Sequence, residues 1–277
     1  MIKIVGLDLD GTTLNEEGKL SDFTRAVLHR AMDEGVHIVV TTGRTFAALP
    51  KEITDIEELE YIITSNGAHI TRMADRKVIY SRYIPEDAIC NLAKLIKQKG
   101  WSIEVFTGGK AYMEKAEYEY FKNADKSYRD IEYIVRTRNP VEDVIGFMLS
   151  HGKEIENVNI NFEDLDEKAR ARDELASIGD VNLTSSFIHN WEIGGANTSK
   201  GNALSALCDE LGLNAAEELL ACGDSPNDIS MIKAAKVGVC VENGTKETRA
   251  AADYIYPSNK EDGVAKAIID FVLEKRD

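Results

Sequence analysis

The sequence predicts an α/β fold, in which a Rossmann-like parallel sheet with helices on both faces is interrupted by an inserted α+β domain. Two stretches predict the sheet: apolar runs alternate with helical patterns over residues 1–66, and again from residue 201 onward. The region between them predicts the insertion, because short strand patterns and helices follow one another there without regular alternation. We therefore expect a core domain formed by residues 1–82 and 190–277, and an inserted second domain formed by residues 83–189.

The first core stretch contains three strand patterns and one helix. Ile2 to Leu7 is a short apolar run, typical of a strand that is buried on both faces. Ser21 is a good N-cap residue for a helix over residues 22–33. Residues 36–40 and 61–63 are further apolar runs that end in polar turns, so we expect both to be strands of the same sheet.

The second core stretch repeats this alternation after the insertion. Its helical patterns have the spacing of one buried face, and its strand patterns are short and apolar. The predicted elements are a helix at 201–211, strands at 219–222 and 237–241, and helices at 229–235, 246–252 and 262–273.

The middle of the chain has a mixed pattern. Arg76-Lys77 is expected to turn a hairpin between residues 69–73 and 78–80, and a helix is expected over residues 85–99, with Pro85 near its start and Gly100 just after its end. The remaining expectations are strands at 102–106, 111–113, 145–150, 158–162, 181–184 and 189–193, and a helix at 165–176.

Composition limits the classes of function. The chain has 277 residues, 43% of them apolar, and a formal charge of −15. Because an acidic surface repels phosphate backbones and anionic membranes, we expect neither nucleic acid nor a membrane as a partner. The N-terminus lacks a signal-peptide pattern, no run reaches the roughly 20 apolar residues of a membrane span, and the four cysteines show no paired spacing. We expect a cytoplasmic protein with reduced thiols.

The sharpest candidate for chemistry is the string Asp8-Leu9-Asp10-Gly11-Thr12, which follows the first strand. Residues two apart at a strand end point to the same side, so both carboxylates are expected to face one site. An EF-hand calcium loop is excluded, because the glycine is fourth and the twelfth residue is Lys19. The remaining alternative is a solvated turn.

A second polar string, Gly223-Asp224-Ser225-Pro226-Asn227-Asp228, follows another apolar strand and precedes a helix. Its carboxylate and amide oxygens suit a hard divalent cation. Taken alone, the string is equally compatible with a helix-capping loop. Because ligands of parallel α/β sheets bind beyond the carboxyl ends of the strands, the presence of Asp8 and Asp10 at the same edge favours a metal site.

Two weaker signals lie elsewhere in the core stretches. Thr42 and Gly43 follow a predicted strand, where a hydroxyl and free N–H groups could donate to a phosphate. An ordinary strand-to-helix turn would have the same sequence pattern. Lys200 stands at the start of a predicted helix, where a cation is locally unfavourable unless anions lie nearby. A plain surface lysine is the alternative.

These four strings resemble, in their order, the four motifs of the haloacid dehalogenase superfamily. The chain looks most like the Cof-type branch, whose α/β cap is inserted between the second and third motifs, where the mixed middle segment lies. Ser65-Asn66-Gly67-Ala68 and Glu261-Asp262-Gly263-Val264 also resemble that branch. Thr13 stands where many relatives have leucine.

The resemblance implies a mechanism. Asp8 would be the nucleophile that forms an aspartyl-phosphate, and Asp10 the general acid and base. Magnesium would be held by Asp8, the Asp10 backbone carbonyl and Asp224, with Asp228 orienting this shell. The implied ligands of the transferring phosphate oxygens are Thr42, Lys200 and Asn227.

The implied function is a magnesium-dependent phosphomonoester hydrolase acting on a small phosphorylated metabolite, either a sugar phosphate or a phosphorylated cofactor. One alternative is a phosphomutase or phosphotransferase, which would use the same aspartyl-phosphate but pass the phosphoryl group to a hydroxyl. A non-catalytic protein that binds a phosphorylated ligand is a further alternative, although it would not need Asp8, Asp10 and Lys200 together.

Overall fold

The structure, a computed structural model, describes residues 1–274 and divides into two compact units. Unit 1 comprises Met1–Gly43, Leu49–Ser81 and the described chain from Ser199 onward. Unit 2 comprises Arg44–Ala48 and Arg82–Thr198. Each unit has its own sheet and its own apolar core.

The sheet of unit 1 has eight strands in the order β14-β13-β12-β1-β2-β3-β4-β5. The pairs from β14 to β3 are parallel, and β4 and β5 extend the sheet as an antiparallel hairpin. The strands are β1 (Ile4–Leu7), β2 (His37–Thr41), β3 (Tyr61–Thr64), β4 (His69–Arg72), β5 (Lys77–Ser81), β12 (Leu219–Gly223), β13 (Val237–Val241) and β14 (Tyr254–Tyr256).

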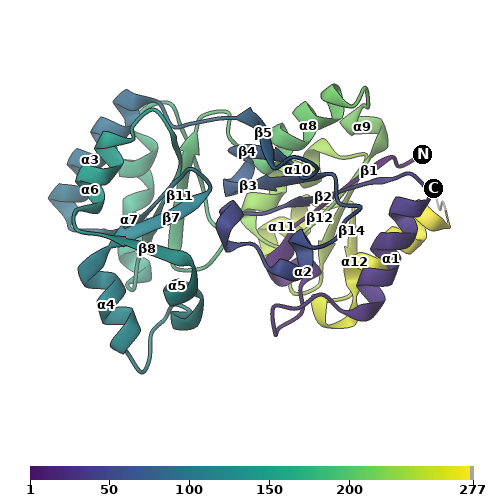
Figure 1. Ribbon diagram of the computed structural model, residues 1–277, viewed down its shortest axis with the longest axis horizontal. Helices are drawn as coiled ribbons and strands as arrows, with labels where there is room; N and C mark the ends of the chain where they lie inside the picture. Colours follow the sequence, from purple (N-terminus) through teal and green to yellow (C-terminus); the bar gives the residue numbers. More distant parts are fainter. Residues whose placement is uncertain (275–277) are drawn as a thin grey trace. The chain divides into compact units, whose positions relative to one another are not determined.

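Helices cover both faces of this sheet, as predicted (Figure 1). On one face, Val5 and Leu7 of β1 pack in a core with α1 (Asp22–Asp33) and α12 (Gly263–Ile268). On the other, Ile4 packs in a core with α8 (Lys200–Glu210) and α10 (Ile229–Ala234). Burial on both faces explains why the central strands are almost wholly apolar. Shorter helices of this unit are α2 (Lys51–Thr54), α9 (Ala215–Glu218) and α11 (Lys246–Ala251).

Unit 2 contains a six-stranded sheet in the order β10-β11-β9-β6-β7-β8, antiparallel except for the β7–β8 pair. Its strands are β6 (Ser102–Thr107), β7 (Lys110–Glu114), β8 (Arg138–Val141), β9 (Ile155–Asn161), β10 (Val181–Thr184) and β11 (Asn190–Gly195). Its helices are α3 (Glu86–Lys99), α4 (Lys115–Asn123), α5 (Ile131–Thr137), α6 (Val144–Ser150) and α7 (Leu165–Ala176).

The two faces of this second sheet differ in chemistry. Along β9, Val158 and Ile160 join the apolar core that α3, α6 and α7 complete. The intervening Asn159 points to the other face, where it donates a hydrogen bond to Glu104 of β6. Unit 2 is therefore an α+β unit with one apolar and one polar sheet face.

The structure corrects two expectations for the middle of the chain. Residues 145–150, expected to be a strand, lie in α6, where the Asp143 side chain caps the first turn by accepting from the Gly146 N–H. A short apolar run fits a strand or a buried helix equally well from its pattern.

Unit 2 also continues to Thr198 instead of ending at residue 189, because β11 pairs with β9 and β10 of that unit. The helices α4 and α5 were not expected.

The structure contains no helix, within the 274 described residues, that combines the length and the apolar character needed to cross a membrane. Three of the cysteines, Cys208, Cys222 and Cys240, are buried, Cys90 is exposed, and all four are free thiols.

Candidate active site

Asp8 comes directly after β1 and is 5% exposed. Its main chain is fixed on both sides: its N–H donates to the Cys222 carbonyl at 3.0 Å, and its carbonyl accepts from the Thr13 hydroxyl at 2.5 Å. Residues 9–13 then form a wide turn, closed by a bond from the Leu14 N–H to the Leu9 carbonyl at 2.9 Å, in which Asp10 and Gly11 have non-helical backbone angles and Gly11 has a φ of +77°. This turn ends the strand abruptly and leaves the Asp8 side chain at the carboxyl end of the sheet.

Asp224 comes directly after the neighbouring strand, β12. One of its carboxylate oxygens accepts from the Thr12 hydroxyl at 2.8 Å, and the other accepts from the Ser225 hydroxyl at 2.9 Å. A Cβ at Gly11 would lie 2.8 Å from Asp224 Oδ2. Gly11 is therefore required twice, for its positive φ and for the close approach of this carboxylate.

Lys200 is the first residue of α8 and has no exposed surface. Its Nζ lies 2.6 Å from Asp8 Oδ1 and 2.6 Å from Asp228 Oδ1. Burial alone would lower the pKa of Lys200, but Asp228 and Asp8 outweigh burial and raise it above its ordinary value. The ammonium group therefore stays charged between two carboxylates, and these anions offset its poor position at a helix start.

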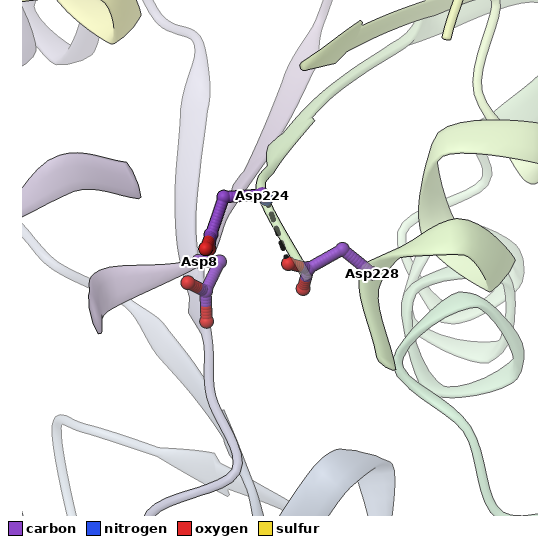
Figure 2. Close-up of side chains that lie close together, drawn as sticks. All are labelled: Asp8, Asp224 and Asp228. Carbon is purple, nitrogen blue, oxygen red and sulfur yellow. Dashed lines mark hydrogen bonds between the residues drawn. The ribbon is translucent and has the colours of Figure 1, made fainter. Parts of the chain in front are cut away.

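Asp228 is fully buried, and both of its carboxylate oxygens are engaged. Oδ1 accepts from Lys200, while Oδ2 accepts from the backbone N–H groups of Asp224 and Ser225, each at 2.9 Å. Asp228 thus ties the loop after β12 to the lysine. Figure 2 shows its carboxylate beside those of Asp8 and Asp224, with the bond to the Asp224 backbone drawn as a dashed line.

The three clustered carboxylates fit a divalent cation. Asp8, Asp224 and Asp228 each offer an oxygen within 4.8 Å of the others, and with Lys200 the group carries a net charge of −2 when all are ionised. Burial raises the pKa of Asp8; Lys200 opposes this shift, while Asp228, Asp224 and Asp10 reinforce it. Burial and Asp228 raise the pKa of Asp224 to about 6. Such crowding is what a hard cation with oxygen ligands would relieve.

The other predicted site residues lie around this cluster in unit 1. Thr42 is buried; its N–H donates to the Ile63 carbonyl at 2.9 Å, and its own carbonyl accepts from the Asn66 N–H at 3.1 Å. Gly43 follows and is half-buried. The Asn227 amide donates to Asn66 Oδ1 at 3.0 Å. Asp10 is exposed and is not one of the three clustered carboxylates, although its charge contributes to the raised pKa of Asp8.

Sequence reasoning gave no role to Thr12 or Asn66, which the structure places in direct contact with predicted site residues. Thr12 belongs to the first motif. Its place in that motif, four residues after Asp8, was the signal available in the sequence. Asn66 has a φ of +57°, and Gly67 after it has a φ of +96°. A Cβ at Gly67 would lie 2.2 Å from the Ser199 carbonyl oxygen, so this turn packs directly on the residue that precedes Lys200. The signals for that turn were the Asn-Gly pair after a strand and the resemblance of residues 65–68 to the Cof-type branch.

Comparison with known proteins identifies the family of the chain. The family described as haloacid dehalogenase-like hydrolase matches residues 5–268. The 5-amino-6-(5-phospho-D-ribitylamino)uracil phosphatase YcsE of Bacillus subtilis (strain 168) is 29% identical over 276 residues, which cover 98% of this chain and 96% of that protein. Phosphatase YwpJ of the same organism is 28% identical, covering 95% of this chain and 98% of its own.

Solved structures share the whole fold. A haloacid dehalogenase-like hydrolase from B. subtilis superposes with a TM-score of 0.82 at 24% identity, covering 96% of this chain and 99% of that one. The subclass IIB sugar phosphatase BT4131 gives a TM-score of 0.81 at 22% identity, covering 97% and 98%. These likenesses confirm the predicted fold class. Together with the family match over residues 5–268, they confirm the resemblance seen in the motifs: the chain belongs to the haloacid dehalogenase-like hydrolase family and is a phosphatase.

Proposed function

We propose that this phosphatase hydrolyses phosphomonoesters through a transient aspartyl-phosphate on Asp8, with Mg²⁺ as its cofactor. The observation that supports this most is the setting of the Asp8 carboxylate. It lies at the end of a central strand, Oδ1 accepts from Lys200, and the described part of the chain gives Oδ2 no hydrogen-bond partner. One oxygen is therefore oriented by a fixed cation, while the other can attack.

Mg²⁺ would be held by Asp8, Asp224 and the Asp10 backbone carbonyl. We assign Asp228 an orienting role, because both of its oxygens are already engaged by Lys200 and by backbone N–H groups. A phosphate dianion repels each carboxylate by about 4 kcal/mol per unit-charge pair at 4 Å and an effective dielectric of 20, and the bound cation would supply the charge that offsets this repulsion.

The reaction then consists of two successive displacements at phosphorus, and protein side chains act in both. In the first, an Asp8 oxygen forms a bond to phosphorus while the ester bond breaks, and Asp10 donates a proton to the leaving alkoxide. In the second, Asp10 takes a proton from water, which attacks phosphorus and releases inorganic phosphate and free Asp8. Lys200, Thr42 with the Gly43 N–H, and Asn227 would hold the phosphoryl oxygens as their charge shifts.

The substrate in this proposal is a small phosphorylated metabolite, either a sugar phosphate or a phosphorylated cofactor. Support comes from the named relatives, of which one acts on a phosphoribitylamino-uracil and another on sugar phosphates. The net charge of −15 argues against nucleic acid or an anionic membrane as a partner. Unit 2 corresponds in this proposal to the inserted cap, and the free thiols suit a cytoplasmic location.

The test uses p-nitrophenyl phosphate with purified protein and Mg²⁺. Asp8→Asn removes the nucleophile at nearly constant shape, so hydrolysis should fall to background. Asp10→Asn should lower kcat by roughly 10²- to 10⁴-fold, the usual contribution of a general base, because the attacking water of the second displacement loses its proton acceptor. Asp209→Asn, an exposed carboxylate on α8, serves as the matched control and should keep the wild-type rate. An Asp8→Asn variant with wild-type activity would refute the mechanism.

Hexose phosphates separate hydrolysis from the phosphomutase alternative. A hydrolase should release inorganic phosphate from them without any bisphosphate activator. Isomerised hexose phosphate that appears only with such an activator, and without free phosphate, would favour a mutase.

A further inference from the structure

Asn66 lies in the turn after β3 and contacts two of the predicted phosphate-binding residues. Its backbone N–H donates to the Thr42 carbonyl at 3.1 Å, and its side-chain Oδ1 accepts from Asn227 Nδ2 at 3.0 Å. The turn, Ser65–Gly67, packs against β3, β4 and α8. All of these residues belong to unit 1, so the position of Asn66 among them is set within that unit.

The same turn also contacts the start of α8, which carries Lys200. A Cβ at Gly67 would lie 3.1 Å from the Lys200 backbone nitrogen, so the two backbones pack directly on each other. Asn66 therefore contacts Thr42 and Asn227 itself, and its neighbour Gly67 contacts Lys200. Three predicted phosphate-binding residues, distant from one another in the sequence, thus surround one turn.

This turn holds Asn66 in a backbone conformation that few side chains adopt. Ser65 and Asn66 have φ values of +51° and +57°. Asparagine tolerates this region better than most residues, so the turn alone gives one reason for an asparagine at position 66. Glycine would suit the positive φ still better, however, and would need no side-chain partner. The backbone conformation therefore does not explain the bond between Asn66 and Asn227.

The two amides leave polar atoms unsatisfied. Asn66 and Asn227 are buried, yet Asn66 Nδ2 and Asn227 Oδ1 have no hydrogen-bond partner among residues 1–274. A buried polar group without a partner costs free energy, so the few that occur in native proteins need an explanation. Asn66 Nδ2 carries two hydrogens, and Asn227 Nδ2 keeps one besides the hydrogen that it gives to Asn66. An anion with several acceptor oxygens, such as a phosphoryl group, matches these donors.

We propose that Asn66 is a further phosphate-binding residue: its Nδ2 donates to a phosphoryl oxygen, and its Oδ1 orients Asn227 so that the Asn227 amide donates to the same group. This inference rests on the proposed function and extends it, because Asn66 lies outside the four motifs that supply the other phosphate-binding residues. Neutral donors suit this place, since they bind an anion without adding a further charge to the buried cluster of Asp8, Asp228 and Lys200.

Binding of inorganic phosphate in the presence of Mg²⁺, measured by isothermal titration calorimetry, tests the donor. Asn66→Gly keeps a residue that accepts the positive φ and removes the amide. The Kd for phosphate should rise by roughly 10- to 100-fold, as expected for loss of a hydrogen bond to a charged group, and kcat/KM on p-nitrophenyl phosphate should fall by a similar factor. The shift in Tm caused by Mg²⁺ alone should stay near wild type, because Asn66 does not contact the proposed metal ligands.

Asn66→Asp separates the two halves of the amide. Aspartate also adopts positive φ and keeps an acceptor for Asn227, but it replaces the Nδ2 donor by an oxygen that carries charge. It should therefore bind phosphate more weakly than Asn66→Gly does, because like charges repel. Wild-type phosphate affinity in Asn66→Asp would overturn the inference.

The matched control is Arg76→Gly, which changes an exposed turn residue of the same unit with a φ of +56°. It should leave the phosphate Kd and kcat/KM within about twofold of wild type, since it changes the same kind of turn away from the cluster. Thermal melting of all variants identifies any loss that comes from unfolding. An equal loss in Arg76→Gly would overturn the inference.

A double-mutant cycle tests whether Asn66 orients Asn227. Asn227→Ala should cost less in the Asn66→Gly background than in the wild type, because the Asn227 amide has then already lost the partner that holds it. Strictly additive losses would overturn the orienting role.

The outcomes distinguish this inference from the proposed function. An active wild type whose phosphate Kd and kcat/KM are matched by Asn66→Gly would refute only the inference. Absence of Mg²⁺-dependent hydrolysis in the wild type would refute the proposed function and the inference together.

Discussion

Lys200 lies between Asp8 and Asp228 without any exposed surface, an unusual environment for a lysine. Replacing it by methionine would leave two carboxylates buried without their cation. Lys200→Met should therefore lower the free energy of unfolding by roughly 3–5 kcal/mol, measured by urea denaturation without added metal. The exposed Lys233 of α10 provides the control, and Lys233→Met should stay within about 0.5 kcal/mol. Equal stabilities of the two variants would show that the buried ion pairs contribute little.

Asp224 contributes to the proposed cation site, so it should link metal binding to stability. Mg²⁺ at a hundred times its Kd should stabilise the wild type by about 2.7 kcal/mol, raising Tm, and EDTA should reverse the shift. Asp224→Asn should lose most of this Mg²⁺ effect, whereas Asp209→Asn should keep it. A full Mg²⁺-dependent shift in Asp224→Asn would place the cation elsewhere.

At the scale of elements, Gly201 decides how closely α8 can approach α10. A Cβ at Gly201 would lie 2.3 Å from the Ser230 carbonyl oxygen, and the Gly201 N–H donates to the Ser230 hydroxyl at 3.1 Å. Alanine normally stabilises a helix relative to glycine by about 1 kcal/mol. Here Gly201→Ala should instead destabilise by roughly 1–3 kcal/mol, because the helices must separate.

The same substitution should also reduce activity, since Gly201 directly follows Lys200. Glu210→Ala is the control, because this exposed residue near the end of α8 tests a change in helix propensity without a change in packing. Stability and kcat should both stay nearly unchanged. Should Gly201→Ala prove as stable and active as the wild type, α8 would have more freedom than its contact with α10 indicates.

The elements of the core could be predicted from the sequence because each is specified locally. Short apolar runs correctly predicted the parallel strands. Ser21 correctly predicted the start of α1, where its hydroxyl accepts from the Thr24 N–H. In unit 2, local signals were weaker. The α6 run resembled a strand, and α4 is mostly polar, with Phe121 as its one buried residue.

The candidate site was predictable only in part. Asp8 and the string from Asp224 to Asp228 follow strand ends, and Lys200 begins a helix; in the structure these side chains lie in one cluster. The Asn66–Asn227 bond joins residues 161 positions apart, and no local pattern carries such information. The assignment of residues 44–48 to unit 2 likewise depends on tertiary contacts with the β6–β7 turn and Tyr133.

At the scale of the whole molecule, Glu104 should make stability depend on pH. Burial alone would raise its pKa, but Arg138 and Arg129 outweigh burial and lower it from 4.5 to about 2. A carboxylate with a depressed folded-state pKa stabilises the protein above its unfolded pKa, and this contribution disappears as pH falls from about 4.5 to 2. The contribution amounts to at most about 3 kcal/mol.

Urea denaturation of wild type and Glu104→Gln between pH 7 and pH 3 measures this effect. The variant should be less stable at pH 7, because Arg129 and Arg138 lose their buried counter-charge. The difference between the two proteins should shrink steadily below pH 4.5. A difference that stays constant over this range would show that Glu104 does not titrate with the predicted shift.

Formation of a covalent bond between phosphorus and Asp8 is the central claim, and chemical trapping tests it most directly. Wild-type protein is mixed with p-nitrophenyl phosphate and Mg²⁺, quenched in acid during turnover, and reduced with borohydride, which converts an acyl phosphate to an alcohol. Peptide mass spectrometry should then find homoserine at position 8, dependent on substrate and absent from Asp8→Asn. Homoserine at a different carboxylate of the active enzyme, with residue 8 unmodified, would contradict the account.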